Sequence, residues 1–166
     1  MKSVKGIILA GGNGSRLYPL TFGTSKQLLP VYDKPMIYYP LSVFMQSGIK
    51  DILIISTKED LPKFKKLLGN GKSLGINICY EVQLKPNGIA ESFIIAESFI
   101  GNSNVSLILG DNIFHGKYFI SKVIDAKKKL REGFSSIFGV SVKNPENFGV
   151  IEFDKENNIK RIIEKP

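Results

Sequence analysis

The sequence predicts an α/β fold with a mainly parallel central sheet and helices on both faces. Short apolar runs, each bounded by glycine or polar residues, alternate along the chain with longer segments of helical spacing. Strands that alternate with helices form right-handed crossovers and therefore lie parallel to one another. At 166 residues the chain has the length of one domain and can bury a substantial core. We expect a single domain over residues 1–166.

Each predicted strand carries an apolar core that is too short for a free-standing helix. The first two cores are continuously apolar, which is typical of strands buried on both faces. In the third, apolar and polar residues alternate, and Cys79 is expected there as a buried small side chain. The last two strands flank a polar turn at 154–158 and should form a hairpin. The predicted strands are residues 7–10, 52–55, 76–80, 105–109, 136–142, one that starts at 150, and 159–164.

The predicted helices have recognisable start and stop signals. Pro40 suits the first turn of a helix, where its missing N–H costs little, and Gly48 and Gly69 suit helix ends. Asp60 can cap the second helix. The third is apolar nearly all round and is therefore expected to be buried. The predicted helices are residues 36–47, a short one between Asp60 and Gly69, 89–99, and 119–130.

The charge and hydropathy of the chain indicate which kinds of binding partner it can have. The net charge of +8 comes mostly from lysines in segments of helical periodicity, which we interpret as solvated helix faces. A basic chain also suits anionic substrates or nucleic acid. Arginine is scarce and no basic stretch is interleaved with aromatic residues, so we expect no nucleic-acid partner. No run approaches the length of a membrane span and no signal-peptide pattern opens the chain, so we expect a cytoplasmic protein with no membrane partner.

A glycine-rich loop follows the first predicted strand directly. Gly11, Gly12 and Gly14 leave few side chains between the backbone and a ligand, so backbone N–H groups can approach a phosphate closely. Arg16 and Lys26 add two cations beside this loop. The loop matches neither the P-loop pattern nor the dinucleotide pattern, in which a third glycine would stand at Leu17. A plain tight turn stays open as the alternative, but the combination indicates polyphosphate handling.

Polar residues also follow two other predicted strands. Gln83 comes after the third strand, and Asp111 with Asn112 comes after the fourth. Ligands of parallel α/β sheets bind outside the carboxyl ends of the strands, so these residues and the glycine loop should share one site. A carboxylate such as Asp111 could hold Mg²⁺ together with phosphate oxygens, although a helix cap or an Asx-turn is the alternative.

Several motifs in order resemble the sugar-phosphate nucleotidylyltransferases. These are GGNGSRL at 11–17, followed by Pro19, Thr21, Lys26 and LLPV, then PVYDKPMIYYPLS at 30–42 and LGDNIF at 109–114. The last two motifs are similar to those of the glucose-1-phosphate thymidylyltransferases. The resemblance covers the whole chain and implies a Rossmann-like three-layer sandwich of the nucleotide-diphospho-sugar transferase type. It also implies that the chain lacks the C-terminal portion of the family.

The resemblance assigns roles on the nucleotide side. Arg16 would face the triphosphate, Lys26 would support the transferred phosphoryl group, and Asp111 would be the metal-binding aspartate. Gln83 would read thymine through its donor and acceptor, and Gly88 would let the base or ribose pack against backbone. The resemblance places three further nucleotide-binding residues in the same loops, namely Ser15, where threonine is commoner, Gly12 and Asn112.

The resemblance also assigns Gly149, Glu164 and Lys165 to the binding of glucose 1-phosphate. The departures from the family pattern are Glu91, where glutamine is usual, His115, where tyrosine is usual, and Phe148, where tyrosine is usual. A carboxylate at 91 is expected to repel phosphate or to alter the ribose contacts. His115 is given no general-base role, because a phosphate nucleophile is already ionised.

The implied reaction transfers a deoxythymidylyl group from dTTP to α-D-glucose 1-phosphate, with Mg²⁺ as cofactor. Its products are dTDP-glucose and pyrophosphate, and dTDP-rhamnose and surface polysaccharide would lie downstream. A full-length form is expected to be a homo-oligomer. Two alternatives stay open: a nucleotide-binding chain without turnover, and a sister enzyme that uses another nucleotide or sugar phosphate.

Overall fold

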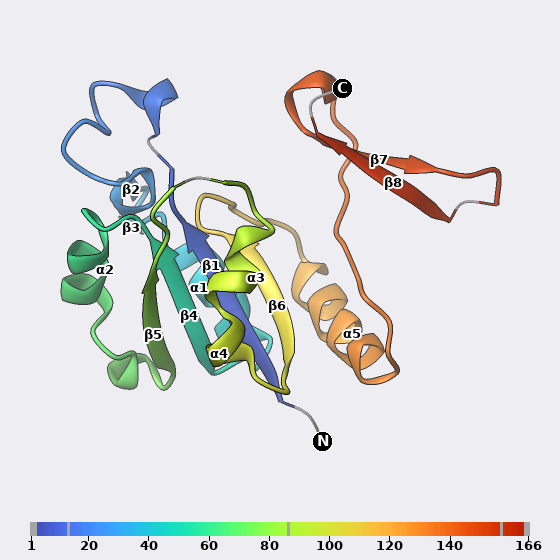
Figure 1. Ribbon diagram of the computed structural model, residues 1–166, viewed down its shortest axis with the longest axis horizontal. Helices are drawn as coiled ribbons and strands as arrows, with labels where there is room; N and C mark the ends of the chain where they lie inside the picture. The colour runs from blue at the N-terminus through green and yellow to red at the C-terminus, as the bar shows by residue number, and fades with distance from the viewer. Residues whose placement is uncertain (1–2, 13, 86, 157, 165–166) are drawn as a thin grey trace. The chain divides into compact units, whose positions relative to one another are not determined.

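The computed structural model describes residues 3–12, 14–85, 87–156 and 158–164 (Figure 1). The chain forms two compact units, Met1–Phe134 and Ser135–Pro166. The first unit holds the sheet, its covering helices and the glycine-rich loop.

Four parallel strands form the sheet of the first unit (Figure 1). They lie in the order β5 (Asn77–Val82), β4 (Asp51–Ser56), β1 (Val4–Ala10) and β6 (Asn104–Leu109). The chain therefore crosses from β1 to β4 and then to β5, and returns to the far side of β1 as β6. All four strands were predicted from their apolar cores, and the parallel pairing is confirmed.

Helices cover both faces of this sheet, as predicted. On one face Ile8 and Ile54 pack in a cluster with side chains from α1 (Tyr38–Gln46), α2 (Leu61–Leu68) and α5 (Phe119–Arg131). On the other face Ile7 and Leu53 pack with Ala96, between the short helices α3 (Glu91–Ile95) and α4 (Glu97–Ile100). Neighbouring strand residues point to opposite faces, so each strand contributes to both layers.

The segment 89–99 is not the single buried helix that its composition predicted. It forms α3 and α4, which are separated at Ala96, where φ is −86° and ψ is 2°. Ser92 and Ala96 are buried, whereas Ile94 is 75% exposed. These helices form the outer layer on their face of the sheet, so only one side of each can pack against the strands.

The side of β5 that carries Cys79 is uncovered at the edge of the sheet. Ile78 is buried, whereas Cys79, one residue further along the strand, is exposed. Successive side chains of a strand point to opposite faces. The expectation that Cys79 is buried was therefore wrong.

Short elements complete the first unit. After β1 come the 3₁₀ turns η1 (Ser15–Leu17) and η2 (Lys26–Leu28) and a small antiparallel ladder between β2 (Pro30–Val31) and β3 (Lys34–Pro35). A third 3₁₀ turn, η3 (Lys72–Leu74), leads into β5. Among the described residues, none of the helices combines the length and apolar character that crossing a membrane requires.

The second unit is built on an antiparallel hairpin of β7 (Gly149–Phe153) and β8 (Ile159–Glu164), preceded by η4 (Pro145–Asn147). The predicted polar turn is confirmed, because Asp154 accepts hydrogen bonds from the backbone N–H groups of Glu156 and Asn158. The predicted strand at 136–142 is wrong. Over the described part of the chain no strand pairs with that segment, and a strand needs a neighbour's N–H and C=O groups to form a ladder.

Candidate active site

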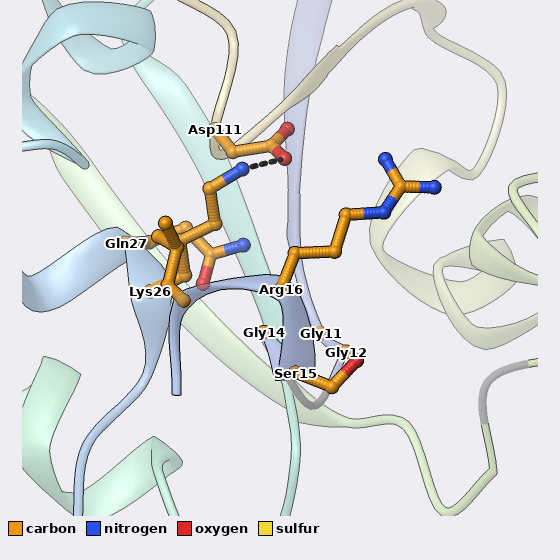
Figure 2. Close-up of a pocket in the computed structure, with 9 residues that line it drawn as sticks. Gly11, Gly12, Gly14, Ser15, Arg16, Lys26, Gln27 and Asp111 are labelled. Atoms are coloured by element: carbon orange, nitrogen blue, oxygen red, sulfur yellow. Dashed lines mark hydrogen bonds and ion pairs between the residues drawn. The ribbon is translucent and has the colours of Figure 1, made fainter. Parts of the chain in front are cut away.

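A pocket of about 230 Å³ lies where β1 and β6 end (Figure 2). It unites the glycine-rich loop with both predicted cations and the predicted metal-binding carboxylate. The residues that line it are Gly11, Gly12, Gly14, Ser15, Arg16, Leu17, Lys26, Gln27 and Asp111. The pocket thus brings together the predicted residues that follow β1 and β6, namely the glycine-rich loop and Asp111, but its lining does not include Gln83 or Asn112.

The loop conformation requires glycine at two positions. Gly12 has φ of 102° and Gly14 has φ of 57°, a region that L side chains rarely adopt. A Cβ at Gly14 would also lie 2.9 Å from the side-chain methyl of Thr21. The Thr21 hydroxyl donates a hydrogen bond of 2.8 Å to the carbonyl of Gly14, and this bond helps to hold the loop in its conformation.

An ion pair crosses the pocket. The Lys26 ammonium lies 3.0 Å from Oδ2 of Asp111, and each side chain is about one-third exposed (Figure 2). Asp111 reaches this place because the N–H of Gly110 donates to the carbonyl of Leu9 at 2.8 Å, which holds the end of β6 against the end of β1. A Cβ at Gly110 would lie 3.0 Å from Cγ of Gln27, so a larger residue here would require Gln27 to shift.

Arg16 is exposed in η1 and its guanidinium extends from the loop (Figure 2). Among the residues that the structure describes, none forms an ion pair or hydrogen bond with it. Lys26 and Asp111 balance each other in charge, so Arg16 leaves the pocket with a net positive charge. A planar guanidinium presents several donors in a fork that fits phosphate oxygens. The pocket is therefore suited to an anionic ligand.

Asp111 provides one carboxylate for a metal. Lys26 contacts Oδ2, so Oδ1 is left for another partner. The described residues contain no group of three or more His, Cys, Asp or Glu side chains that could hold a metal by themselves. Mg²⁺ is typically held by one or two carboxylates together with phosphate oxygens and water. The donor set thus fits a cation that arrives with a polyphosphate, and not a cation held by protein alone.

Gln83 lies against the glycine-rich loop although it does not line the pocket. It is 6% exposed, and its Oε1 is 2.6 Å from the place that a Cβ on Gly11 would occupy. Its Nε2 donates to Oε2 of Glu91 at 2.7 Å, and Nδ2 of Asn87 donates to Oε1 of the same carboxylate at 2.8 Å. Hydrogen bonds from Gln83 and Asn87 hold the pKa of Glu91 below its usual value. Glu91 is thus engaged by two amides.

The structure does not bring the remaining predicted residues to the pocket lining. Gly88 has φ of 102° and open space around its α-carbon, and Asn112 is exposed, with its backbone N–H bound to the carbonyl of Leu109. Gly149 faces Glu164 across the hairpin of the second unit. Lys165 lies outside the described residues. The roles of all these residues in binding stay predictions.

Sequence reasoning missed two residues that shape the site. Gln27 lines the pocket, is 4% exposed and accepts a hydrogen bond from the Ser25 hydroxyl. Its position beside Lys26 within the motif could have revealed it. Lys63 of α2 donates to the carbonyl of Gly23 at 2.9 Å and so ties down the loop between Arg16 and Lys26. No sequence signal separates Lys63 from the other lysines of its helix.

Comparison with known proteins gives a consistent family assignment. A family model described as nucleotidyl transferase matches residues 5–166. Among curated relatives, a glucose-1-phosphate thymidylyltransferase of Neisseria gonorrhoeae is 58% identical over 163 residues, which cover 98% of this chain and 56% of that protein. A glucose-1-phosphate thymidylyltransferase of Xanthomonas campestris is 52% identical over 166 residues, which cover 100% of this chain and 56% of that protein. The chain thus spans about half the length of these relatives.

Solved structures show the same fold. One is the crystal structure of a Bacillus anthracis protein, assigned as a glucose-1-phosphate thymidylyltransferase, in complex with sucrose. It matches this chain with a TM-score of 0.82 and 40% sequence identity. The match covers 99% of this chain and 65% of the Bacillus anthracis chain. A UDP-glucose pyrophosphorylase complexed with UDP-glucose matches with a TM-score of 0.78 over 100% of this chain and 70% of its own. Its 21% identity supports the fold alone. The predicted Rossmann-like sandwich of the nucleotide-diphospho-sugar transferase type is confirmed.

Proposed function

The chain belongs to the nucleotidyl transferase family, and from this premise we propose that it forms the nucleotide-binding part of a glucose-1-phosphate thymidylyltransferase. The observation that carries the proposal is the pocket at the end of β1, where a glycine-rich loop, Arg16, Lys26 and Asp111 converge. Curated relatives that are 58% and 52% identical bear the name of that activity. The substrates would be dTTP and α-D-glucose 1-phosphate.

The glycine-rich loop and Arg16 would bind the β- and γ-phosphates, which leave together as pyrophosphate. The backbone at Gly11, Gly12 and Gly14 can approach phosphate oxygens without steric hindrance. The guanidinium of Arg16 has no acidic partner among the described residues, so no ion pair must break before it binds an anion. These residues stabilise negative charge and do not form covalent bonds to the substrate.

Lys26 and Asp111 would act at the α-phosphate. An oxygen of the sugar phosphate forms a bond to the α-phosphorus while the bond from that phosphorus to the bridging oxygen breaks, and pyrophosphate leaves on the opposite side. The nucleophile is ionised at neutral pH, so no general base is required. Lys26 would neutralise part of the charge that two anions bring together. Lys26 and Asp111 keep each other in place across the pocket at 3.0 Å.

Asp111 would also hold a divalent cation, which we propose to be Mg²⁺. When bound, this cation would neutralise charge on the phosphate oxygens. Asp111 offers Oδ1 for this purpose, while Lys26 occupies Oδ2. The described residues contain no group of three or more His, Cys, Asp or Glu side chains that could hold a metal, so phosphate oxygens and water would supply the other ligands.

The sugar side of the site is proposed from the second unit. Gly149 and Glu164, which stand opposite each other in the hairpin, and Lys165 would contact glucose 1-phosphate. Further segments of a full-length protein would complete the sugar pocket and the contacts between subunits of a homo-oligomer. Both substrates are water-soluble metabolites, and we assign the reaction to the cytoplasm.

Pyrophosphate release tests the proposed reaction. The chain would be mixed with dTTP, glucose 1-phosphate and Mg²⁺, with each component omitted in turn. We expect release that requires both substrates and the metal. If dTTP binds but no pyrophosphate appears, this chain by itself holds a nucleotide without turnover, and if dTTP does not bind, the proposed nucleotide site is contradicted. Faster release with another nucleoside triphosphate would identify a sister enzyme instead.

A further inference from the structure

We propose that Lys26 is the resident counter-ion of Asp111: it keeps a divalent cation out of the ligand-free chain, and it frees Asp111 when a triphosphate draws the ammonium away. This inference rests on the proposed function, because it takes a polyphosphate to bind at the glycine-rich loop and a cation at Asp111. It adds a binding order to that function, since the chain would take up the cation together with the nucleotide and not before it.

In the ligand-free chain the ammonium of Lys26 occupies a place beside Asp111 that a metal cation would need. Its Nζ donates to Oδ2 of Asp111 at 3.0 Å, and both side chains are about one-third exposed (Figure 2). An ion pair that water reaches contributes little net stability. A stronger anionic partner can therefore take over the ammonium of Lys26.

The charges that line the pocket oppose a cation that arrives alone. Arg16 and Lys26 contribute two positive charges, and Asp111 is the only carboxylate among the described residues that line the pocket. A divalent cation at Asp111 would thus have one charged ligand from the pocket lining, while the neighbouring ammonium would repel it. We therefore expect the ligand-free chain to bind a divalent cation weakly.

The stem of Lys26 begins against the glycine-rich loop, on which the phosphates would bind. A Cβ on Gly14 would lie 3.4 Å from Cβ of Lys26, so the first carbon of the lysine side chain contacts the loop. The backbone of Lys26 is held in η2, where its carbonyl accepts a hydrogen bond from the N–H of Leu29 at 3.1 Å. Lysine carries its charge on a flexible four-carbon stem. The ammonium can therefore move from Asp111 to a phosphate at the loop while the backbone stays in place.

A bound triphosphate would reverse the charge balance of the pocket. Its oxygens form charge-assisted hydrogen bonds with an ammonium, so Lys26 would change partner and leave both oxygens of Asp111 to other ligands. The nucleotide and the cation would then bind cooperatively. Linkage requires that each of them raises the affinity for the other by the same factor. Lys26 would contribute to this factor by its change of partner.

Binding of Mn²⁺ alone, followed by electron paramagnetic resonance of the free ion, tests the proposal without any reaction. Lys26→Met keeps an unbranched apolar stem but has no charge. It should bind Mn²⁺ about tenfold more tightly than the wild type, within the range of about 5- to 150-fold that coupled sites show. Lys26→Arg keeps the positive charge and should resemble the wild type. Lys66→Met, at an exposed lysine of α2, is the matched control and should leave the affinity for Mn²⁺ unchanged.

A double variant shows where the ion binds. Lys26→Met combined with Asp111→Asn lacks both the ammonium and the carboxylate. It should lose the gain in Mn²⁺ affinity, because an amide is a poor ligand for this cation. A gain that persists in the double variant would place the ion elsewhere and overturn the proposal.

The remaining outcomes separate this inference from the proposed function. Equal affinities for Mn²⁺ in the wild type and Lys26→Met overturn the inference, as does the lack of detectable binding in both. If Lys26→Met fails to fold, Lys26→Gln replaces it with the same expectation. Calorimetry of the wild type with dTTP and Mg²⁺ tests the proposed function by itself. A wild type that binds no dTTP overturns the proposed function, and with it this inference.

Discussion

The Lys26 ammonium lies 3.0 Å from a carboxylate oxygen of Asp111, and this contact joins two residues that are 85 positions apart in the chain. Lys26 begins η2, whereas Asp111 follows β6. The parallel pairing of β1 with β6 brings both loops to one end of the sheet. The pair balances its own charge, so Arg16 gives the pocket its net positive charge.

Replacing Asp111 by asparagine should remove the metal-dependent part of dTTP binding. The amide is a poor ligand for Mg²⁺ and frees Lys26 to contact phosphate. We expect Mg²⁺ to raise the dTTP affinity of the wild type on the order of tenfold, or about 1.4 kcal/mol, and to leave that of Asp111→Asn unchanged. Calorimetry with Mg²⁺ and with chelator measures both.

Asp125→Asn is the matched control for this experiment. Asp125 is an exposed aspartate of α5 that pairs with Lys128 at 3.0 Å. It should keep the wild-type response to Mg²⁺. An equal response in Asp111→Asn would exclude Asp111 as a metal ligand.

Gly14→Ala should destabilise the glycine-rich loop. Gly14 has φ of 57°, and an added Cβ would lie 2.9 Å from the Thr21 methyl group. A non-glycine residue in this region costs roughly 1–2 kcal/mol. Urea unfolding should show a loss of that size. Gly23→Ala, in the same loop but with open space around its α-carbon, should stay within about 0.5 kcal/mol of wild type. Equal losses at both positions would contradict the loop geometry.

Lys63→Met should lower turnover without unfolding the chain. The change keeps the aliphatic stem but removes the ammonium contacts with the carbonyl of Gly23 at 2.9 Å and with Asp60 at 2.8 Å. Without this tie, the loop that carries Arg16 and Lys26 is held less firmly. We expect a several-fold fall in pyrophosphate release, while Lys66→Met, an exposed lysine of the same helix, has no effect. Indistinguishable rates in the two variants would refute the role of Lys63.

Tyr80 should make the fold sensitive to alkaline pH. Burial, with a smaller contribution from Tyr38, raises the pKa of Tyr80 to about 12, above the value of about 10 in an unfolded chain. The folded state therefore retains the proton more strongly, and stability that is complete below pH 10 is lost as the pH rises toward 12. The phenolate also cannot donate to the carbonyl of Gly69, which the hydroxyl contacts at 2.6 Å.

The free energy of urea unfolding, measured between about pH 9 and pH 11.5, tests the role of Tyr80. Tyr80→Phe has no group that titrates at this position, so its stability should fall less steeply than that of the wild type. Tyr32→Phe, at a side chain that is 97% exposed, should follow the wild type. A parallel decline in wild type and Tyr80→Phe would contradict this account.

The strands at the centre of the sheet were predictable because local sequence and tertiary environment agree. Ile7, Ile8 and Ile52–Ile55 are continuously apolar, and a central parallel strand buries both of its faces. The glycine-rich loop was predictable for a similar reason, since backbone conformation alone requires Gly12 and Gly14. The convergence of that loop with Asp111 followed from the rule that ligands bind at the carboxyl ends of parallel strands.

The sequence did not predict structure correctly where that structure depends on contacts with residues distant in the chain. Residues 136–142 have strand-like composition, but a strand forms only beside another strand. The apolar segment at 89–99 gave no sign of which side would face the sheet. The sequence also did not predict that the two oxygens of Glu91 accept hydrogen bonds from Gln83 and Asn87. No periodicity in the sequence reveals that contact, because it joins the end of β5 to the first turn of α3.

The most direct test of the account is calorimetric titration of dTTP into the wild-type chain, Arg16→Ala and Lys66→Ala. Arg16 supplies the uncompensated positive charge of the pocket, whereas Lys66 is an exposed lysine of α2. Hydrogen bonds between charged groups contribute about 1.5–3 kcal/mol, so Arg16→Ala should weaken dTTP binding by about tenfold or more. Lys66→Ala should bind dTTP with the affinity of the wild type. Equal affinities in all three proteins, or no binding of dTTP by any of them, would contradict a triphosphate site at the glycine-rich loop.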